Sequence, residues 1–395
     1  MVNESLVQEL SKAFQDAFHQ HPLIVRSPGR VNIIGEHTDY NEGFVLPAAI
    51  DKACYLAITL RDDQEIHLVA KDLDQTFTVR LDQVRPLPDH GWPNYILGVV
   101  AQMQKRGIAM SGFNAVLSSD IPIGAGLSSS AAVECATAFA LDAMLGTHLD
   151  RLEMVKMAQM AEHEYAGVKC GIMDQFASMM GKKDHVIKLD CRTLGYEYVP
   201  FKLDGLSILL LNTNVKHALA SSEYNTRRKE CEQAVEWISE YVPNIHSLRD
   251  VTEDMLDRYV QPKDLTIDAR ARFVVREINR LTSGCEELAR GNIKGLGKKM
   301  FATHHGLQAM YQVSCPELDF LVDAVEHRQA VIGARMMGGG FGGCTINLVE
   351  DIAIPGLIRE LKPLYEQETK LPLSYYVTSI EDGTTIIKTN GHVRP

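Results

Sequence analysis

The chain has 395 residues, of which 45% are hydrophobic and 23% charged, so it is long enough for two or three domains and can bury a sizeable core. Its formal net charge of −11 at pH 7 opposes binding to the phosphate backbone of nucleic acid. No apolar run approaches the length of a membrane span, and the composition excludes a disordered or fibrous chain.

The N-terminal third is predicted to begin with a helix and to continue as strands. Apolar residues recur every four positions from Leu6 to Phe18, with acidic residues between them, which predicts an amphipathic helix and not a signal peptide. The segments VRSPGRVNIIG, CYLAITL, EIHLVA and TFTVRL then have strand-like composition and are separated by short polar turns. The pattern therefore predicts a strand-rich region up to Leu81.

A row of polar side chains follows the first of these strands. In GRVNIIGEHTDY the apolar segment leads through Gly35 directly into Glu36, His37, Thr38 and Asp39, and Arg30 lies just upstream. A solvated turn and a site for a small polar ligand both explain such a row. The residues alone leave both interpretations open.

The middle of the chain alternates between helices and strands. Residues 92–107 have helical periodicity and end at a glycine, and residues 113–122 read as a strand. The segment 127–145 is apolar almost all round, which predicts a buried helix that Gly146 ends, and a second helix is predicted over about 151–165. The helix from residue 127 therefore begins inside the glycine-rich segment PIGAGLSSSA.

PIGAGLSSSA, residues 122–131, has the composition of a phosphate-binding turn. Glycines let backbone N–H groups approach a phosphate, a helix N-terminus favours anions, and serine hydroxyls can bind phosphate or Mg²⁺. A dinucleotide-binding turn does not fit, because Ser129 stands where its third glycine is expected and no second strand follows. A P-loop does not fit either, because no lysine follows. A merely serine-capped buried helix remains the alternative.

Two further segments suggest chemistry. CGIMDQF places Asp174 near the start of a short helix, where a carboxylate either complements the helix dipole or acts as a buried general base. Glu162 and Glu164, on the preceding helix, are either solvated or able to hold Mg²⁺ through oxygen. MGGGFGG, residues 337–343, carries five glycines in seven positions, which favours a loop that contacts a ligand over a plain turn.

The second half is predicted to combine long helices with a few strands. Helices are expected over 222–241, 271–290 and 316–327, strands over 185–189 and 206–212, and a strand, glycine loop, strand, helix and strand near the end. We place a domain boundary near residue 205, which gives domains of residues 1–205 and 206–395. The eight scattered cysteines form no CxxC pair, which indicates reduced thiols in a cytoplasmic protein, without a disulfide framework or zinc site.

Five segments together carry a family resemblance, and they occur in the order GRVNIIGEHTDYN, PIGAGLSSSA, CGIMDQF, SEYNTRR and MMGGGFGG. From about Ser27 to the C-terminus the chain resembles the galactokinases, within the small-molecule kinase superfamily named for galacto-, homoserine, mevalonate and phosphomevalonate kinases. The resemblance implies a two-domain α+β protein. Its N-terminal domain would have a mixed sheet, its C-terminal domain would be ferredoxin-like, and the active site would lie in the cleft between them.

The resemblance also implies an activity and a set of site residues. MgATP would phosphorylate the C1 hydroxyl of α-D-galactose, the first step of galactose catabolism, with Asp174 as catalytic base and Arg30 as its electrostatic partner. The residues expected to contact the sugar are Glu36, His37, Asp39, Gly171 and Tyr224. Those expected to bind ATP are Trp92 beside adenine and, around the phosphates, Gly124, Ala125, Gly126, Leu127, Ser128, Ser129 and Ser130. Mg²⁺ would be held by Ser130 and Glu162. Apart from the resemblance, we expect a cytoplasmic enzyme that is a monomer, with an oligomer as the open alternative.

Two rivals to this interpretation share the resemblance. One is a kinase of the same family that acts on another sugar, such as N-acetylgalactosamine, which needs a pocket beside the C2 hydroxyl. The other is a non-catalytic galactose sensor, a protein class that resembles galactokinases but lacks a Ser-Ala pair in the serine-rich loop. This chain retains Ser130-Ala131, which favours the enzyme.

Overall fold

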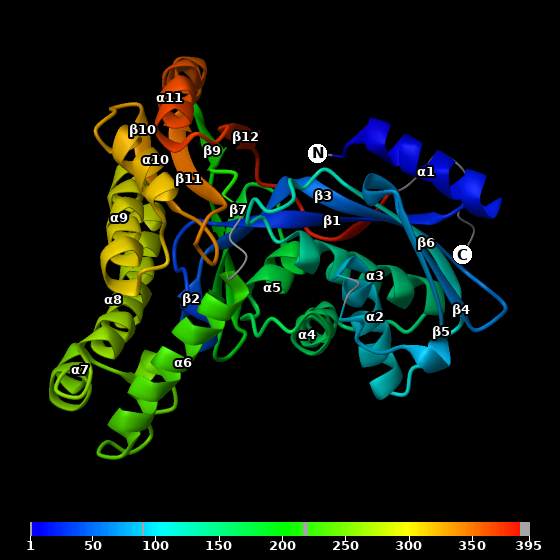
Figure 1. Cartoon of the computed structure of the whole chain (residues 1–395), viewed down its shortest axis with the longest axis horizontal. Helices are drawn as coiled ribbons and strands as arrows, with labels where there is room; N and C mark the ends of the chain where they lie inside the picture. Colours follow the sequence, from blue (N-terminus) through cyan, green and yellow to red (C-terminus); the bar gives the residue numbers. More distant parts are fainter. Residues whose placement is uncertain (1, 89–90, 216–219, 388–395) are drawn as a thin grey trace.

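The computed structural model describes residues 2–88, 91–215 and 220–387, which form two lobes side by side (Figure 1). The first lobe is built on a six-stranded sheet of order β13-β1-β3-β6-β4-β5. All its neighbouring strands are antiparallel except β4 and β6, which are parallel. The strands are β1 (Leu23–Asn32), β3 (Pro47–Leu60), β4 (Glu65–Ala70), β5 (Gln75–Arg80), β6 (Phe113–Ser119) and β13 (Thr385–Ile387).

Helices cover both faces of this sheet because side chains along a strand alternate between its faces. On β3, Leu56 and Ile58 pack into the large core under one face, whereas Tyr55 and Ala57 pack into a small core under the other. The large core is shared with α2 (Gly91–Lys105), α3 (Ser129–Leu145), α4 (Arg151–Ala161) and α5 (Met173–Met180). The small core is closed by α1 (Glu4–Phe18), which lies across the opposite face (Figure 1).

The N-terminal helix shows why the amphipathic pattern folds as it does. Asn3 caps it by accepting a hydrogen bond from the backbone N–H of Leu6, and Leu10 and Phe14 are completely buried. Burial of such a side chain contributes about 1.5–3 kcal/mol. The helix therefore covers the sheet as an integral part of the first lobe.

The second lobe is built on a four-stranded antiparallel sheet of order β10-β11-β9-β12. Its strands are β9 (Leu206–Asn212), β10 (Val331–Met336), β11 (Cys344–Glu350) and β12 (Ser374–Thr378). Its helices are α6 (Ala220–Ser239), α7 (Glu253–Tyr259), α8 (Leu265–Ala289), α9 (Ile293–Gly306), α10 (Pro316–Glu326) and α11 (Ile354–Thr369). A small sheet of β2 (Phe44–Val45), β7 (His185–Asp190) and β8 (Tyr196–Pro200) lies beside the first lobe.

The expected α+β architecture is confirmed, with local differences. The helix expected over 151–165 is regular only to Ala161 and continues as a π-helical turn, Glu162–Ala166. The elements α7, α9, β2 and β8 were not predicted. The short strand β13 pairs with β1, so residues 385–387 join the first sheet, and the division of the chain at residue 205 stays a prediction.

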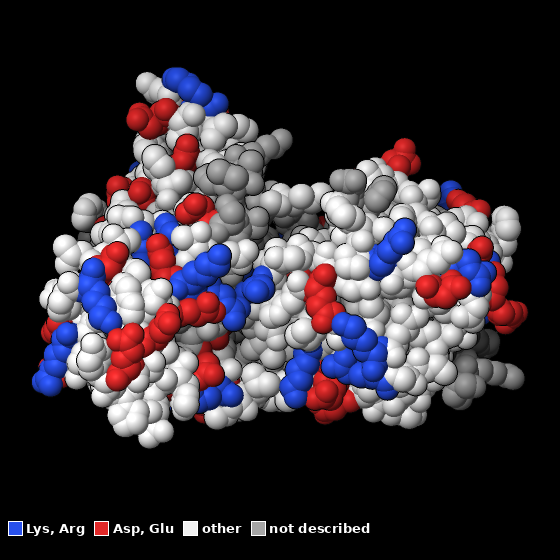
Figure 2. Space-filling view, turned by 60° about the horizontal axis from the view of Figure 1, so that its bottom comes forward, with Lys and Arg blue, Asp and Glu red and all other residues white. Residues whose placement is uncertain are grey.

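The surface carries both signs of charge. Figure 2 shows acidic side chains next to basic ones across one face of the molecule. No helix in the described part of the chain is both long and apolar enough to cross a membrane.

Candidate active site

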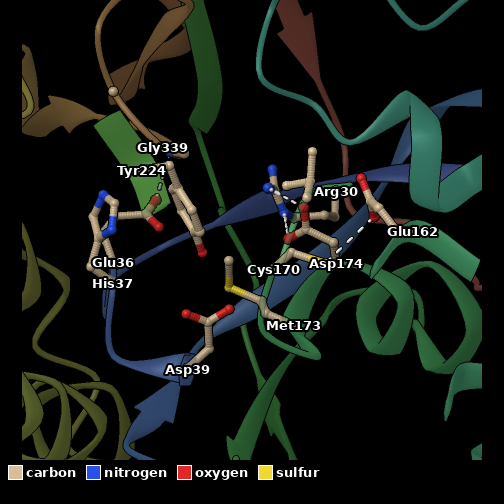
Figure 3. A pocket seen from close by; sticks show the side chains of 13 residues that line it. Arg30, Glu36, His37, Asp39, Glu162, Cys170, Met173, Asp174, Tyr224 and Gly339 are labelled. Atoms are coloured by element: carbon tan, nitrogen blue, oxygen red, sulfur yellow. Dashed lines mark hydrogen bonds and ion pairs between the residues drawn. The ribbon is translucent and has the colours of Figure 1, made fainter. Parts of the chain in front are cut away.

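A cavity of about 280 Å³ lies between the two lobes (Figure 3). The first lobe contributes the end of β1, the segment after it, the π-helical turn and the start of α5, and the second lobe contributes α6 and the glycine loop. The cavity is lined by Arg30, Glu36, His37, Asp39, Glu162, Val168, Cys170, Met173, Asp174, Tyr224, Gly338, Gly339 and Gly340. Most of the polar side chains expected from the sequence are thus brought together at one place.

Arg30 and Asp174 form a two-point ion pair at this cavity. Arg30 Nε lies 2.8 Å from Asp174 Oδ1, and its Nη2 lies 2.9 Å from Oδ2. Arg30 also donates from Nη1 to the carbonyl oxygen of Gly126 at 2.8 Å, and its backbone N–H donates to the carbonyl of Leu127. The predicted pairing of these two side chains is therefore present, and Arg30 links the carboxylate to the glycine-rich loop. A planar guanidinium held at both ends fixes the orientation of Asp174.

The serines of the loop contact carboxylates of the cavity. Ser128 is the N-cap residue of α3, but its hydroxyl donates to Asp174 Oδ2 at 2.5 Å instead of capping the helix. The hydroxyl of Ser130 donates to Glu162 Oε1 at 2.9 Å. Gly124 and Gly126 adopt left-handed φ angles of 75° and 73°, which a turn this tight requires. Ser128 and Ser130 therefore do more than cap a buried helix, which was the alternative left open by the sequence.

A buried carboxylate cluster lies behind Ser130. The side-chain nitrogen of Gln175 donates to Glu162 Oε2 at 2.6 Å and to Glu134 Oε2 at 3.0 Å. Burial, together with the nearby charge of Asp174, raises the pKa of Glu162 to about 7. Burial, and secondarily the charge of Glu162, raises the pKa of Glu134 well above its ordinary value. Glu134 and Gln175 were not predicted from the sequence. Glu134 could have been noticed, because it is an acidic residue within α3, a helix that was expected to be buried on all sides.

Four of the expected sugar contacts line the same cavity as Arg30: Glu36 and His37 are buried, and Asp39 and Tyr224 are half-buried. Burial, and secondarily the charge of Asp174, raises the pKa of Asp39 to about 7. Burial lowers the pKa of His37 to about 4, so its imidazole is neutral at pH 7, and its Nδ1 lies 2.7 Å from the hydroxyl of Tyr40. The ring of Tyr224 lies 5.4 Å from that of His37. The cavity therefore offers the hydrogen-bonding atoms of Asp39 and His37 next to the aromatic ring of Tyr224.

Gly171 lies behind this group. A Cβ at this position would come within 1.9 Å of Asp39 Oδ2, so only glycine allows the Asp39 carboxylate to occupy its place. Gly171 lines a neighbouring hollow together with Asp39, and it falls outside the set of described residues that line the main cavity. Its expected contact with the sugar stays a prediction.

The glycine loop between β10 and β11 closes the cavity from the second lobe. Gly338, Gly339 and Gly340 line it, as expected for a loop that contacts a ligand. Gly340 has a φ of 86°, and a Cβ there would lie 2.1 Å from the carbonyl oxygen of Val313. Part of the glycine content therefore serves the packing of the loop against its own lobe.

Glu36 is held from the second lobe. Its Oε1 accepts hydrogen bonds from the backbone N–H of Gly338 and from Arg335 Nη1, each at 2.9 Å. Arg335 was not among the residues expected from the sequence. It occupies a buried strand directly before the glycine run, and a lone arginine in that position was the available signal.

Trp92 is placed differently from the other expected residues. It lies at the start of α2, and its indole N–H donates to the side chain of Gln75 at 2.8 Å. Its neighbours Gly91, Asn94 and Tyr95 line a separate hollow of about 300 Å³ together with Glu164 and residues of the π-helical turn. The expected contact of Trp92 with adenine stays a prediction.

Comparisons with known proteins agree with this arrangement. Three family models match the chain: the galactokinase galactose-binding signature over residues 12–60, the GHMP kinases N terminal domain over 94–182, and the GHMP kinases C terminal over 286–362. The galactokinase of Thermotoga neapolitana is 43% identical over 91% of this chain and 98% of its own length. That of Roseiflexus sp. is 39% identical over 97% of each chain.

Solved structures give the same result. The galactokinase of Lactococcus lactis, solved in complex with galactose, superimposes with a TM-score of 0.93 at 34% identity, over 97% of this chain and all of that one. The mevalonate kinase of Methanococcus jannaschii has a TM-score of 0.64 at 21% identity, over 91% of this chain and 99% of that one, and thus shares the fold. On these matches, and with the family motifs gathered at one cavity, the chain belongs to the galactokinase family of the GHMP kinases.

Proposed function

We propose that this chain transfers the terminal phosphoryl group of ATP to the C1 hydroxyl of α-D-galactose and releases galactose 1-phosphate and ADP. The observation that carries the proposal is the position of Asp174. Arg30 and Ser128 hold its carboxylate at the wall of a cavity that also presents Glu36, His37 and Asp39. The full-length relatives described above are galactokinases, and the one from Lactococcus lactis was solved with galactose.

The sugar end of the cavity suits a ligand that offers only hydroxyl groups. Glu36 is almost completely buried, and Asp39 lines the same cavity with a carboxylate that the surrounding protein desolvates. Charged acceptors in fixed positions form strong hydrogen bonds with hydroxyls, and they penalise an analogue that lacks the matching group. Selectivity for one sugar then follows from which hydroxyls can reach these carboxylates.

The phosphoryl transfer needs positioning more than covalent chemistry from the protein. The C1 hydroxyl oxygen bonds to the terminal phosphorus of ATP while the bond from that phosphorus to the bridging oxygen breaks and ADP leaves. Asp174 accepts the proton of the hydroxyl, and Arg30 stabilises the negative charge beside it. In this proposal the loop around Gly124 and Gly126, whose φ angles are left-handed, supplies backbone N–H groups to the phosphates.

Ser130 and Glu162 fit a magnesium ion that arrives with the nucleotide. Within residues 2–88, 91–215 and 220–387, no group of three or more His, Cys, Asp or Glu side chains is arranged to hold a metal. Mg²⁺ commonly takes only one or two protein oxygens and completes its shell with phosphate and water. The hydroxyl of Ser130 and the buried carboxylate of Glu162 supply such a pair. Bound there, the ion would neutralise phosphate charge.

The function is tested by measuring ADP release with a panel of sugars. Galactose, N-acetylgalactosamine, arabinose and glucuronate should be compared at equal concentrations with saturating MgATP. We expect turnover to be fastest with galactose. Preference for another sugar would contradict the proposal, and a folded chain that binds galactose but releases no ADP would be a sensor instead.

The raised pKa of Asp39 predicts a pH dependence of sugar recognition. Because this pKa is about 7, the ionised carboxylate that accepts sugar hydrogen bonds is lost as the pH falls through that value. We expect kcat/KM for galactose, measured with saturating MgATP, to be constant above about pH 8 and to fall by about tenfold per unit below about pH 6. A profile that stays flat down to about pH 5 would show that Asp39 does not bind the sugar in its ionised form.

The Mg²⁺ assignment predicts a change of metal requirement in Ser130→Ala. Removal of the hydroxyl deletes one of two protein oxygens at the ion, so we expect the Mg²⁺ concentration for half-maximal rate to rise by about tenfold. The matched control is Ser118→Ala, which removes a buried hydroxyl that donates to Asp72 at 2.7 Å outside the cavity. An unchanged Mg²⁺ requirement in Ser130→Ala would remove Ser130 from the metal site.

The cellular location and the oligomeric state of the protein are predicted from the sequence alone. All eight cysteines lie in the described part of the chain as free thiols. The cytoplasmic location and the monomeric state stay predictions.

A further inference from the structure

Arg335 is a fully buried cation at the junction of the two lobes. It lies on β10, and none of its side-chain surface is exposed. Its Nε donates to the carbonyl oxygen of Ile33 at 2.9 Å, and its Nη2 donates to the carbonyl of Asn32. Its Nη1 donates to Glu36 Oε1 at 2.9 Å and to its neighbour's carbonyl, that of Met336, at 2.6 Å. One side chain of the second lobe therefore holds both the end of β1 and the polar segment that follows it.

These contacts occupy one side of the Glu36 carboxylate. Oε1 accepts from Arg335 and from the N–H of Gly338, so it is saturated by the second lobe. Figure 3 shows Glu36 next to Gly339 and Tyr224 at the wall of the cavity. The remaining oxygen of Glu36 is the one available to a hydroxyl in the cavity.

We propose that Arg335 is a positioning residue for sugar recognition, which fixes the Glu36 carboxylate and ties it to the glycine loop. The inference rests on the proposed function, in which Glu36 binds the sugar. A rotated Glu36 would lose the directed acceptor that a hydroxyl needs. Because Gly338 belongs to the loop that closes the cavity, the same contacts link sugar binding to the position of that loop.

The backbone that carries Glu36 has an anchor of its own, which distinguishes positioning of the carboxylate from a merely structural role of Arg335. The backbone N–H of Gly35 donates to Glu277 Oε1 at 2.9 Å, and the hydroxyl of Thr303 holds the same carboxylate. The path of the chain after β1 is therefore anchored independently of Arg335. Loss of the guanidinium is expected to disturb the Glu36 carboxylate more than the backbone that carries it.

The test compares Arg335→Lys with Arg26→Lys. Lysine keeps the charge but cannot direct several hydrogen bonds from one plane. Arg26 is a matched control because it is also buried and donates to the carbonyl oxygens of Ile50, Asp51 and Asp382, on a different part of the first sheet. We expect Arg335→Lys to weaken galactose binding by about 10- to 100-fold, measured by calorimetry, with KM for ATP changed by less than about threefold.

A double-mutant cycle then links the effect to Glu36. If Arg335 acts through that carboxylate, Arg335→Lys should weaken galactose binding no further in a chain that already carries Glu36→Gln. Should Arg335→Lys not fold, Arg335→Gln combined with Glu36→Gln keeps a neutral hydrogen-bonded pair. That double variant is expected to bind galactose as weakly as Glu36→Gln alone.

Several results would overturn the inference. They are unchanged galactose affinity in a folded Arg335→Lys, an equal loss in Arg26→Lys, and full additivity with Glu36→Gln. If the wild-type chain phosphorylates galactose, each of these results rules out the role of Arg335 and leaves the proposed function intact. If the wild-type chain neither binds nor phosphorylates galactose, both the role of Arg335 and the proposed function are wrong.

Discussion

Asp174→Asn is expected to lower kcat by roughly 10²- to 10⁴-fold while the Kd for galactose changes by less than about threefold. The amide has the shape of the carboxylate but can neither accept the proton of the C1 hydroxyl nor balance the charge of Arg30. In the proposed site the sugar is held mainly by Glu36 and Asp39, which line the same cavity and which the substitution leaves in place. Steady-state ADP release gives kcat, and calorimetry gives the Kd.

The control for this variant is another arginine–carboxylate pair in which the guanidinium contacts both carboxylate oxygens. Arg249 Nη1 and Nη2 lie 2.7 and 3.0 Å from the two oxygens of Asp190, and Asp190 is 18% exposed, against 23% for Asp174. Asp190→Asn is expected to keep its kcat. Near-normal turnover in Asp174→Asn, or an equal loss in Asp190→Asn, would remove Asp174 from the mechanism.

Arg30→Lys should be the second most damaging change, with kcat reduced by about 10²-fold. Lysine carries the charge but cannot contact both oxygens of Asp174 and the carbonyl of Gly126 from one rigid plane. The carboxylate and the glycine-rich loop would then lose their common anchor. We expect KM for ATP to rise as well, because that loop is the proposed phosphate site.

Arg249→Lys is the matched control for Arg30→Lys, since it breaks the same kind of pair outside the main cavity. Its kinetic constants are expected to stay within about twofold of those of the wild type. If Arg30→Lys retains full activity in a folded chain, the electrostatic role assigned to Arg30 is wrong.

The overall architecture could be predicted from the sequence because its patterns are strong. The four-residue repeat of apolar positions in the first helix and the apolar stretch of α3 correspond to helices that bury those residues. The five ordered motifs identified the family, and through it the pairing of Arg30 with Asp174. Two residues 144 positions apart cannot be paired from composition or spacing alone.

Other features depend on tertiary contacts that a local pattern does not carry. The three residues of β13 are too few for a periodic signal, and they form a strand only because β1 offers an open edge. The π-helical turn places Glu162 opposite Ser130, and a regular helix had been expected there. The sequence shows that Arg335 and Glu134 are charged residues within apolar segments, but it does not reveal which residues they contact.

The two-lobe construction explains why those partners matter. Asp174 and Arg30 belong to the first lobe, whereas Glu36 is held by a strand and a loop of the second. The cavity therefore depends on groups that meet only in the folded chain. Changes at Arg335 and at Arg30 should accordingly affect different kinetic constants, sugar affinity in one case and turnover in the other.

The most direct test of the central claim is phosphorus NMR of the products formed by the wild-type chain from galactose and MgATP. We expect ADP and a sugar phosphate esterified at C1 to form in equal amounts, and Asp174→Asn to form neither at a comparable rate. A phosphate at another carbon of the sugar, or ATP that remains intact beside bound galactose, would contradict the account.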